Sequence, residues 1–77
     1  MTEVLFPELS AKEPDTEGVV ATWFVRTGEH VVTDQLIAEV QVDKVSAEVP
    51  SPAAGTIELL VDEGATVVQR TPIARVR

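Results

Sequence analysis

The sequence repeats itself once, and this repeat limits the possible folds more than any other feature of the chain. Residues 28–40 align without a gap with residues 64–76, and six of the 13 aligned positions are identical. The shared residues are the opening glycine, a Val-Val pair and an Ile-Ala-x-Val ending. Gly18 and Gly55 precede the two segments at nearly equal distances. Two such halves are expected to form about four strands each, related by a pseudo-two-fold axis.

The residue types favour strands over helices. Val, Ile and Thr account for 25 of the 77 residues, and four Gly and five Pro interrupt the chain at short intervals. β-Branched side chains pack well on a pleated sheet, and no long window shows helical spacing of apolar residues. We therefore expect an all-β domain over residues 1–77, a flattened barrel or sandwich of two roughly four-stranded antiparallel sheets. The expected strands are residues 2–6, 19–25, 31–32, 36–42, 45–49, 56–61, 67–68 and 73–76.

Charge and cysteine content exclude several classes of function. The 13 acidic residues outnumber the six basic ones, and the formal net charge of −7 disfavours nucleic acid and anionic membranes as partners. The absence of Cys excludes disulfides and thiolate metal sites. The N-terminus lacks the features of a signal peptide, and no apolar run approaches the ~20 residues of a membrane span. We expect a cytoplasmic domain that is monomeric in isolation.

A two-residue turn at Asp43-Lys44 would pair the flanking residues into a hairpin with one apolar and one polar face. The apolar pairs are Val42 with Val45, Val40 with Ala47, and Ala38 with Val49. The polar pairs are Gln41 with Ser46, and Glu39 with Glu48. Because side chains alternate between the faces of a strand, this pattern specifies the register of the hairpin. In a two-fold arrangement, this hairpin and the chain ends lie at opposite poles.

Lys44 stands at a turn position where local preferences favour a different residue. Two-residue hairpin turns prefer Asn-Gly, Asp-Gly or Gly-X, because their central residues often require a positive φ. A local rule broken inside an otherwise consistent hairpin indicates a functional residue. The alternative is that Lys44 is an ordinary solvated lysine, and the residues alone leave both interpretations open.

The turn carries Val42-Asp43-Lys44-Val45, and residues 49–55 continue as Val-Pro-Ser-Pro-Ala-Ala-Gly. Gly28 lies 16 residues before Lys44, and Gly55 lies 11 residues after it. With these motifs and spacings the chain resembles, over essentially its whole length, the lipoyl domain of 2-oxo acid dehydrogenase complexes. That family has a modified lysine at a hairpin tip between two glycines at these distances.

The resemblance implies a barrel-sandwich fold and a carrier function. Lys44 would bear lipoate as an amide, with Asp43 and Val45 flanking it in the turn. The domain would be a non-catalytic part of a dihydrolipoamide acyltransferase (E2) chain, a swinging arm that carries acyl groups and reducing equivalents. The implied partners are a lipoate-attaching enzyme, a thiamine-diphosphate-dependent 2-oxo acid decarboxylase (E1), the acyltransferase core and dihydrolipoamide dehydrogenase (E3).

The chain departs from the family pattern at two places. Gln41 replaces a frequent Glu three residues before the lysine, and the loop from Glu8 to Glu17 lacks the usual glycines and is longer. That loop is expected beside Lys44 and is involved in partner recognition in the family, so the identity of the complex stays open. Two other functions also stay open: a biotin carrier, although that family brackets its lysine with Met, and an unmodified adaptor barrel. An enzyme is not expected, because no nucleophile–base pair or phosphate-binding loop is visible, and His30, the single His, has no ligand cluster around it.

Overall fold

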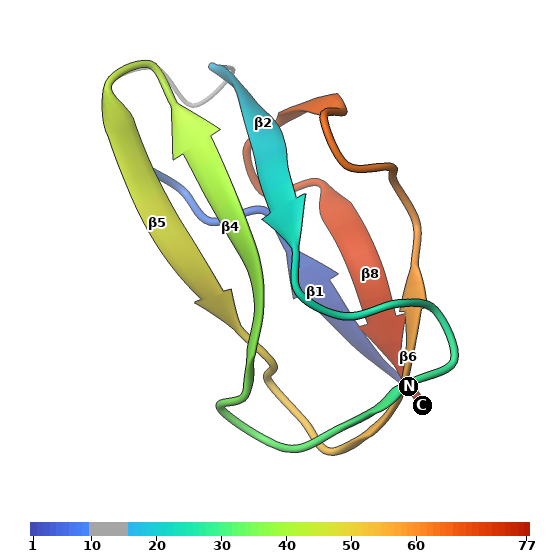
Figure 1. Ribbon diagram of the computed structural model, residues 1–77. Helices are drawn as coiled ribbons and strands as arrows, with labels where there is room; N and C mark the ends of the chain where they lie inside the picture. The colour runs from blue at the N-terminus through green and yellow to red at the C-terminus, as the bar shows by residue number, and fades with distance from the viewer. Residues whose placement is uncertain (10–15) are drawn as a thin grey trace.

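The computed structural model describes residues 1–9 and 16–77 and shows two four-stranded antiparallel sheets (Figure 1). One sheet has the order β1-β8-β6-β3 and the other the order β5-β4-β2-β7. The strands are β1 (Thr2–Leu5), β2 (Glu17–Trp23), β3 (His30–Val31), β4 (Leu36–Val42), β5 (Val45–Pro50), β6 (Gly55–Leu59), β7 (Thr66–Val68) and β8 (Pro72–Val76). The expectation of an all-β sandwich of two such sheets is confirmed.

Each expected strand is present, and the strand at Leu36–Val42 has the expected bounds. The largest shift is at β2, which begins at Glu17 rather than at residue 19 and ends at Trp23 rather than at residue 25. It begins earlier because β7 pairs with it from Glu17 opposite Val68, a contact that the local alternation of residue types does not reveal. Val25 lies beyond the strand and is still buried in the core.

The internal repeat corresponds to a two-fold relation between the sheets. Exchanging β1 with β5, β8 with β4, β6 with β2, and β3 with β7 converts one strand order into the other. The backbone follows the same relation, since the N–H of Phe24 donates to Ile37 at 2.9 Å and that of Leu60 donates to Ile73 at 2.9 Å. Asp34 and Arg70, 36 residues apart, have nearly equal positive φ angles of 70° and 72°.

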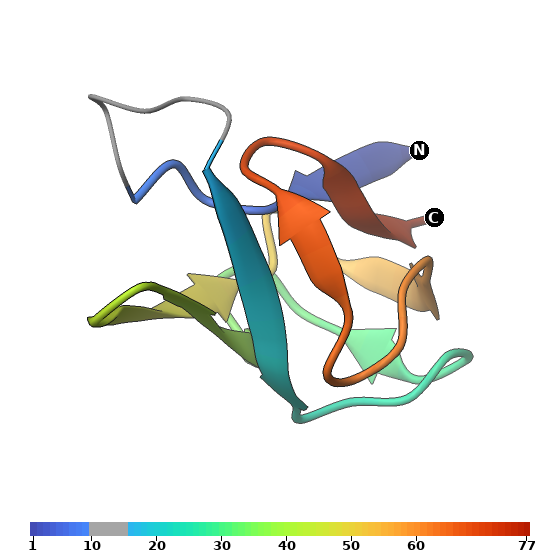
Figure 2. The same ribbon diagram turned by 90° about the horizontal axis from the view of Figure 1, so that it is seen from above.

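The chain ends and the β4–β5 turn lie at opposite poles of the sandwich, as the repeat predicts. β1 pairs with β8, with Thr2 opposite Val76, so the two chain ends lie side by side. The turn between β4 and β5 lies at the opposite end of the molecule, which measures 34 × 19 × 17 Å (Figures 1 and 2). We call these regions the terminal end and the Lys44 end.

A single apolar core lies between the sheets. Both halves contribute β-branched residues that are fully buried. Phe6 is the largest of the fully buried side chains. The buried core residues are Val4, Phe6, Val20, Val25, Val31, Ile37, Ala38, Val40, Val42, Val49, Ile57, Ile73, Ala74 and Val76. Burying this much apolar surface is the main source of stability in a chain without disulfides.

Candidate functional site at the tip of the β4–β5 hairpin

The hairpin register is the one that the sequence predicts. All five expected pairs are present, from Val42 opposite Val45 to Ala38 opposite Val49. Leu36 opposite Pro50 extends the ladder by one further pair, across a register shift. Asp43 and Lys44 are therefore the two residues of the turn.

Three residues from different parts of the chain close the core directly behind this turn. Phe6 follows β1 and is fully buried, and Val42 at the end of β4 is 3% exposed. Gly18 of β2 lies against both of them: a Cβ at this position would overlap the Phe6 ring and would stand 2.8 Å from Cγ2 of Val42. The glycine therefore lets β2 pass close to the ring, and the packing fixes the root of the hairpin.

The turn itself projects beyond this packing. Asp43 and Lys44 are exposed, and Val45 is 51% exposed although it faces the buried Val42. Val42 and Val45 differ in exposure because of the sheet order: β4 has β2 as a second neighbour in the sheet, whereas β5 is an edge strand. The apolar face predicted for the hairpin is thus buried at Val42 and open at Val45.

The backbone strain of the turn lies at Asp43. Asp43 has a φ of 53°, whereas Lys44 is not among the described residues with positive φ. The expectation that Lys44 occupies the unfavourable position is therefore wrong, and Asp43 takes it because Asp tolerates the left-handed region better than most residues. The Asp43 side chain forms no hydrogen bond with any described residue, so the turn is not held by such a contact.

The amine of Lys44 is unengaged within residues 1–9 and 16–77, where it has no ion pair or hydrogen bond. Val19 pairs with Gln41, and extending that register by two residues brings Glu17 of β2 level with Asp43. The loop expected beside Lys44 falls mainly on residues 10–15, outside the described residues. Its described end at Glu17 enters β2 at the Lys44 end.

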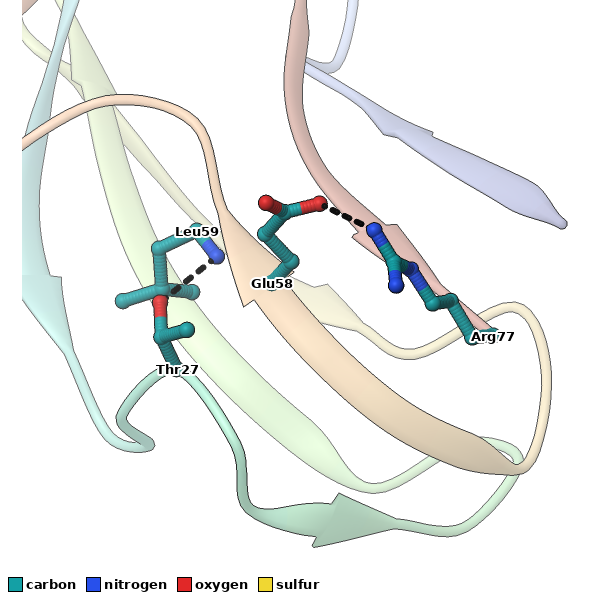
Figure 3. Close-up of polar contacts among 4 residues, drawn as sticks. All are labelled: Thr27, Glu58, Leu59 and Arg77. Carbon is teal, nitrogen blue, oxygen red and sulfur yellow. Dashed lines mark hydrogen bonds and ion pairs between the residues drawn. The ribbon is translucent and has the colours of Figure 1, made fainter.

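The terminal end contains polar contacts of a different kind. Thr27 accepts a hydrogen bond from the Leu59 backbone at 3.0 Å, and Arg77 pairs with Glu58 at 3.4 Å (Figure 3). His30 is exposed in β3 and pairs through its backbone with Thr56. Within the described part of the chain, no three His, Cys, Asp or Glu residues gather as metal ligands. The same part contains no helix that could cross a membrane.

Two contacts between distant parts of the chain are not evident from the sequence, one at the root of the hairpin and one at the far end of β2. The sequence marks Gly18 only as part of the repeat, and its contact with Phe6 and Val42 joins residues from three separate strands or strand ends. Glu63 has the sequence context of a solvated turn, but its Oε1 accepts a hydrogen bond from the Trp23 backbone at 3.0 Å. The repeat could have indicated the Glu63 contact, because Thr27, 36 residues before Glu63, accepts the equivalent hydrogen bond from Leu59.

Known proteins share this fold and sequence. A family described as "Biotin-requiring enzyme" matches residues 2–76. The acetyltransferase component of the pyruvate dehydrogenase complex of Corynebacterium glutamicum is 46% identical over 76 residues, 97% of this chain and 11% of the relative. The succinyltransferase component of the 2-oxoglutarate dehydrogenase complex of Escherichia coli K12 is 40% identical, over 97% of this chain and 18% of the relative.

A solved structure agrees with these relatives. The lipoyl domain of the 2-oxoglutarate dehydrogenase complex from Azotobacter vinelandii superposes with a TM-score of 0.70 and 36% identity, over 100% of this chain and 92% of that one. The chain spans only about a tenth to a fifth of the two curated relatives named above. With its sheet order, its hairpin and these similarities, the chain belongs to the biotin- and lipoyl-attachment family, as a lipoyl carrier domain of the kind found in acyltransferases of 2-oxo acid dehydrogenase complexes.

Proposed function

We propose that Lys44 is the covalent attachment site of lipoate, with Asp43 and Val45 as the flanking residues of the turn. The observation that carries this proposal is the position of Lys44 at the exposed tip of a hairpin whose root is packed by Phe6 and Gly18. An attaching enzyme must reach the amine from outside, and no described residue competes for it. The only other lysine is Lys12, which lies outside the described residues.

The residues of the turn fit such a group. Amide formation at Nζ removes the positive charge of Lys44, so the formal charge of the chain changes from −7 to −8. Lipoate, when attached, supplies a dithiolane that accepts and releases acyl groups and electrons, and the chain itself has no Cys. The hairpin displays the arm on a rigid root, and the flanking Asp43 and Val45 are exposed for recognition.

The domain then acts as a tethered carrier between partners. The partners that we propose are a lipoate-attaching enzyme, a 2-oxo acid decarboxylase, an acyltransferase core and dihydrolipoamide dehydrogenase. The relatives support this set, since they are components of pyruvate and 2-oxoglutarate dehydrogenase complexes. Residues 1–77 would form one such domain within an acyltransferase chain in the cytoplasm, and tethering would raise its effective concentration at each active site.

Intact mass measurement tests the proposal. The chain is expressed with lipoate and a lipoate-attaching enzyme, and in parallel with biotin and a biotin-attaching enzyme. One lipoyl group per chain is expected in the first case, and no added mass in the second. Biotin at Lys44 would replace the proposal with the biotin carrier, and an unmodified chain in both cases would favour an adaptor barrel.

A further inference from the structure

A groove of about 210 Å³ lies between β1 and β5, the two edge strands that face each other across the open side of the sandwich. The residues that line it are Glu3, Val4, Leu5 and Pro7 on one side and Glu48, Val49, Pro50 and Pro52 on the other. Val4 and Val49 form the floor and are 3% and 4% exposed, whereas Leu5 is 47% exposed on the wall. The groove is therefore apolar at its base and accessible from solvent.

The two walls are related by the same two-fold axis as the sheets. Residues 3–7 read Glu-Val-Leu-Phe-Pro and residues 48–52 read Glu-Val-Pro-Ser-Pro, so Glu, Val and the final Pro recur in equivalent places. The backbone confirms the equivalence. Phe6 N donates to Thr71 at 2.9 Å, and Ser51 N donates to Gln35 at 2.8 Å, with the acceptors 36 residues apart. The groove thus has one carboxylate on each wall, Glu3 and Glu48, and no basic lining residue.

The surroundings of these two carboxylates break the symmetry. Glu3 stands opposite the basic Arg75 in the β1–β8 ladder, although the two form no ion pair in the described structure. Glu48 stands opposite Glu39 in the β4–β5 ladder, and directly opposed like charges destabilise a sheet. Neither Glu39 nor Glu48 has an ion pair among the described residues. The Glu48 side of the groove is therefore where an added cation gains most.

We propose that this groove docks an extended segment of a partner protein that presents an apolar side chain next to a Lys or Arg. The apolar side chain enters the groove over Val4 and Val49, against Leu5, and the cation lies beside Glu48 and Glu39. Binding relieves the repulsion between the two glutamates, and the net charge of −7 attracts a basic segment from a distance.

The shape and chemistry of the groove argue against two other modes of binding, enclosure of a small-molecule ligand and addition of a strand. Its volume lies below the roughly 300–1,000 Å³ of pockets that enclose small-molecule ligands. The addition of a strand along β5 is blocked towards its end, because Pro50 and Pro52 have no N–H to donate. A segment that inserts a single side chain fits the small volume and needs no strand pairing at the end of β5. Lys44 is not among the residues that line the groove, so the proposal does not depend on lipoylation.

Titration of the ¹⁵N-labelled, unmodified chain with the blocked peptide Ac-Ala-Ala-Leu-Arg-Ala-Ala-NH₂ tests the proposal. Saturable shifts at millimolar peptide are expected at the amides of Val4, Leu5, Glu48 and Val49. Replacing Leu by Ser in the peptide should abolish them, and replacing Arg by Gln should weaken binding. Added salt should also weaken binding, because the contribution of the cation is screened.

Three variants with the same loss of charge identify the position of the cation. Glu48→Gln is expected to weaken binding roughly two- to fivefold, the range for an exposed ion pair, and Glu3→Gln less than that. Glu29→Gln, exposed and outside the groove lining, should leave binding unchanged. The absence of saturable shifts, shifts centred elsewhere, or an equal effect of Glu29→Gln and Glu48→Gln would overturn the proposal.

Discussion

The two ends of the sandwich share one backbone plan and differ in what fills it. At the Lys44 end the chain turns between β4 and β5, whereas at the terminal end the equivalent strands β8 and β1 hold the two chain ends. Phe6 and Ser51 are equivalent and both fully buried. The Phe6 ring packs behind the turn, whereas the hydroxyl of Ser51 donates a local hydrogen bond to Ala53 at 2.6 Å.

This difference shows how a symmetric scaffold is made to display one group. The turn needs a rigid root under an exposed tip, and Phe6, Gly18 and Val42 provide it by close packing. At the terminal end the position equivalent to Phe6 holds the small Ser51, and Gly55 packs closely against the Arg77 backbone instead of an aromatic ring. The fold is thus common to both ends, and the site belongs to one of them.

The largest expected effect is the loss of lipoylation when Lys44 is replaced, which affects the Lys44 end alone. Lys44→Arg should abolish lipoylation completely, because the amine that forms the amide is lost. The free energy of unfolding should change by less than about 0.5 kcal/mol, since the residue is exposed. Intact mass and thermal unfolding measure the two quantities, and Lys12→Arg is the control that should remain modified. A lipoylated Lys44→Arg variant would refute the assignment.

The next effect tests the packed root of the hairpin. Gly18→Ala should lower the free energy of unfolding by about 1–3 kcal/mol, because the added methyl overlaps the Phe6 ring. The cost of Gly18→Ala should be smaller in a chain that already carries Phe6→Val, because the ring that the methyl overlaps is then absent. Chemical denaturation of both single variants and the double variant measures this difference.

Gly64→Ala is the matched control for this cycle. Gly64 has a φ of 86°, and a methyl group added to it would meet no neighbour within 4 Å, so its cost comes from backbone strain alone. Phe6→Val should not reduce that cost. Simple additivity of Gly18→Ala and Phe6→Val would show that the ring does not require the glycine.

The smallest effect tests the symmetry itself. Glu63 accepts from the Trp23 backbone and Thr27 from the Leu59 backbone, each at 3.0 Å. Glu63→Ala and Thr27→Val should each cost about 0.5–1 kcal/mol, since both remove one exposed acceptor. Glu63→Gln, which keeps an acceptor oxygen, should cost less than Glu63→Ala in the same denaturation assay. Unequal costs for the two truncations would show that the equivalent contacts are energetically different.

The sequence predicted the features that depend on local periodicity. The hairpin register followed from alternating apolar and polar residues between Ala38 and Val49, because a slip by one residue would reverse both faces. The repeat predicted the separation of Lys44 from the chain ends, since equivalent strands must occupy equivalent places in both sheets.

The features that the sequence did not predict depend on contacts between distant segments or on the exact turn geometry. Nothing local indicates that Gly18 lies against Phe6, since only the closed core brings them together. Turn preferences drew attention to Lys44, but the positive φ falls on Asp43. The groove was missed because its two Glu-Val-x-x-Pro walls lie outside the aligned repeat segments.

Exchanging Asp43 and Lys44 tests the central claim most directly, because it moves the amine by one position without changing the composition. The exchanged chain places Lys at the position with a φ of 53° and directs the amine differently from the turn. The initial rate of lipoylation by the attaching enzyme, measured by mass against the wild-type chain, should fall to a small fraction. A rate equal to that of the wild type would contradict the claim that the geometry of the hairpin tip makes Lys44 the site.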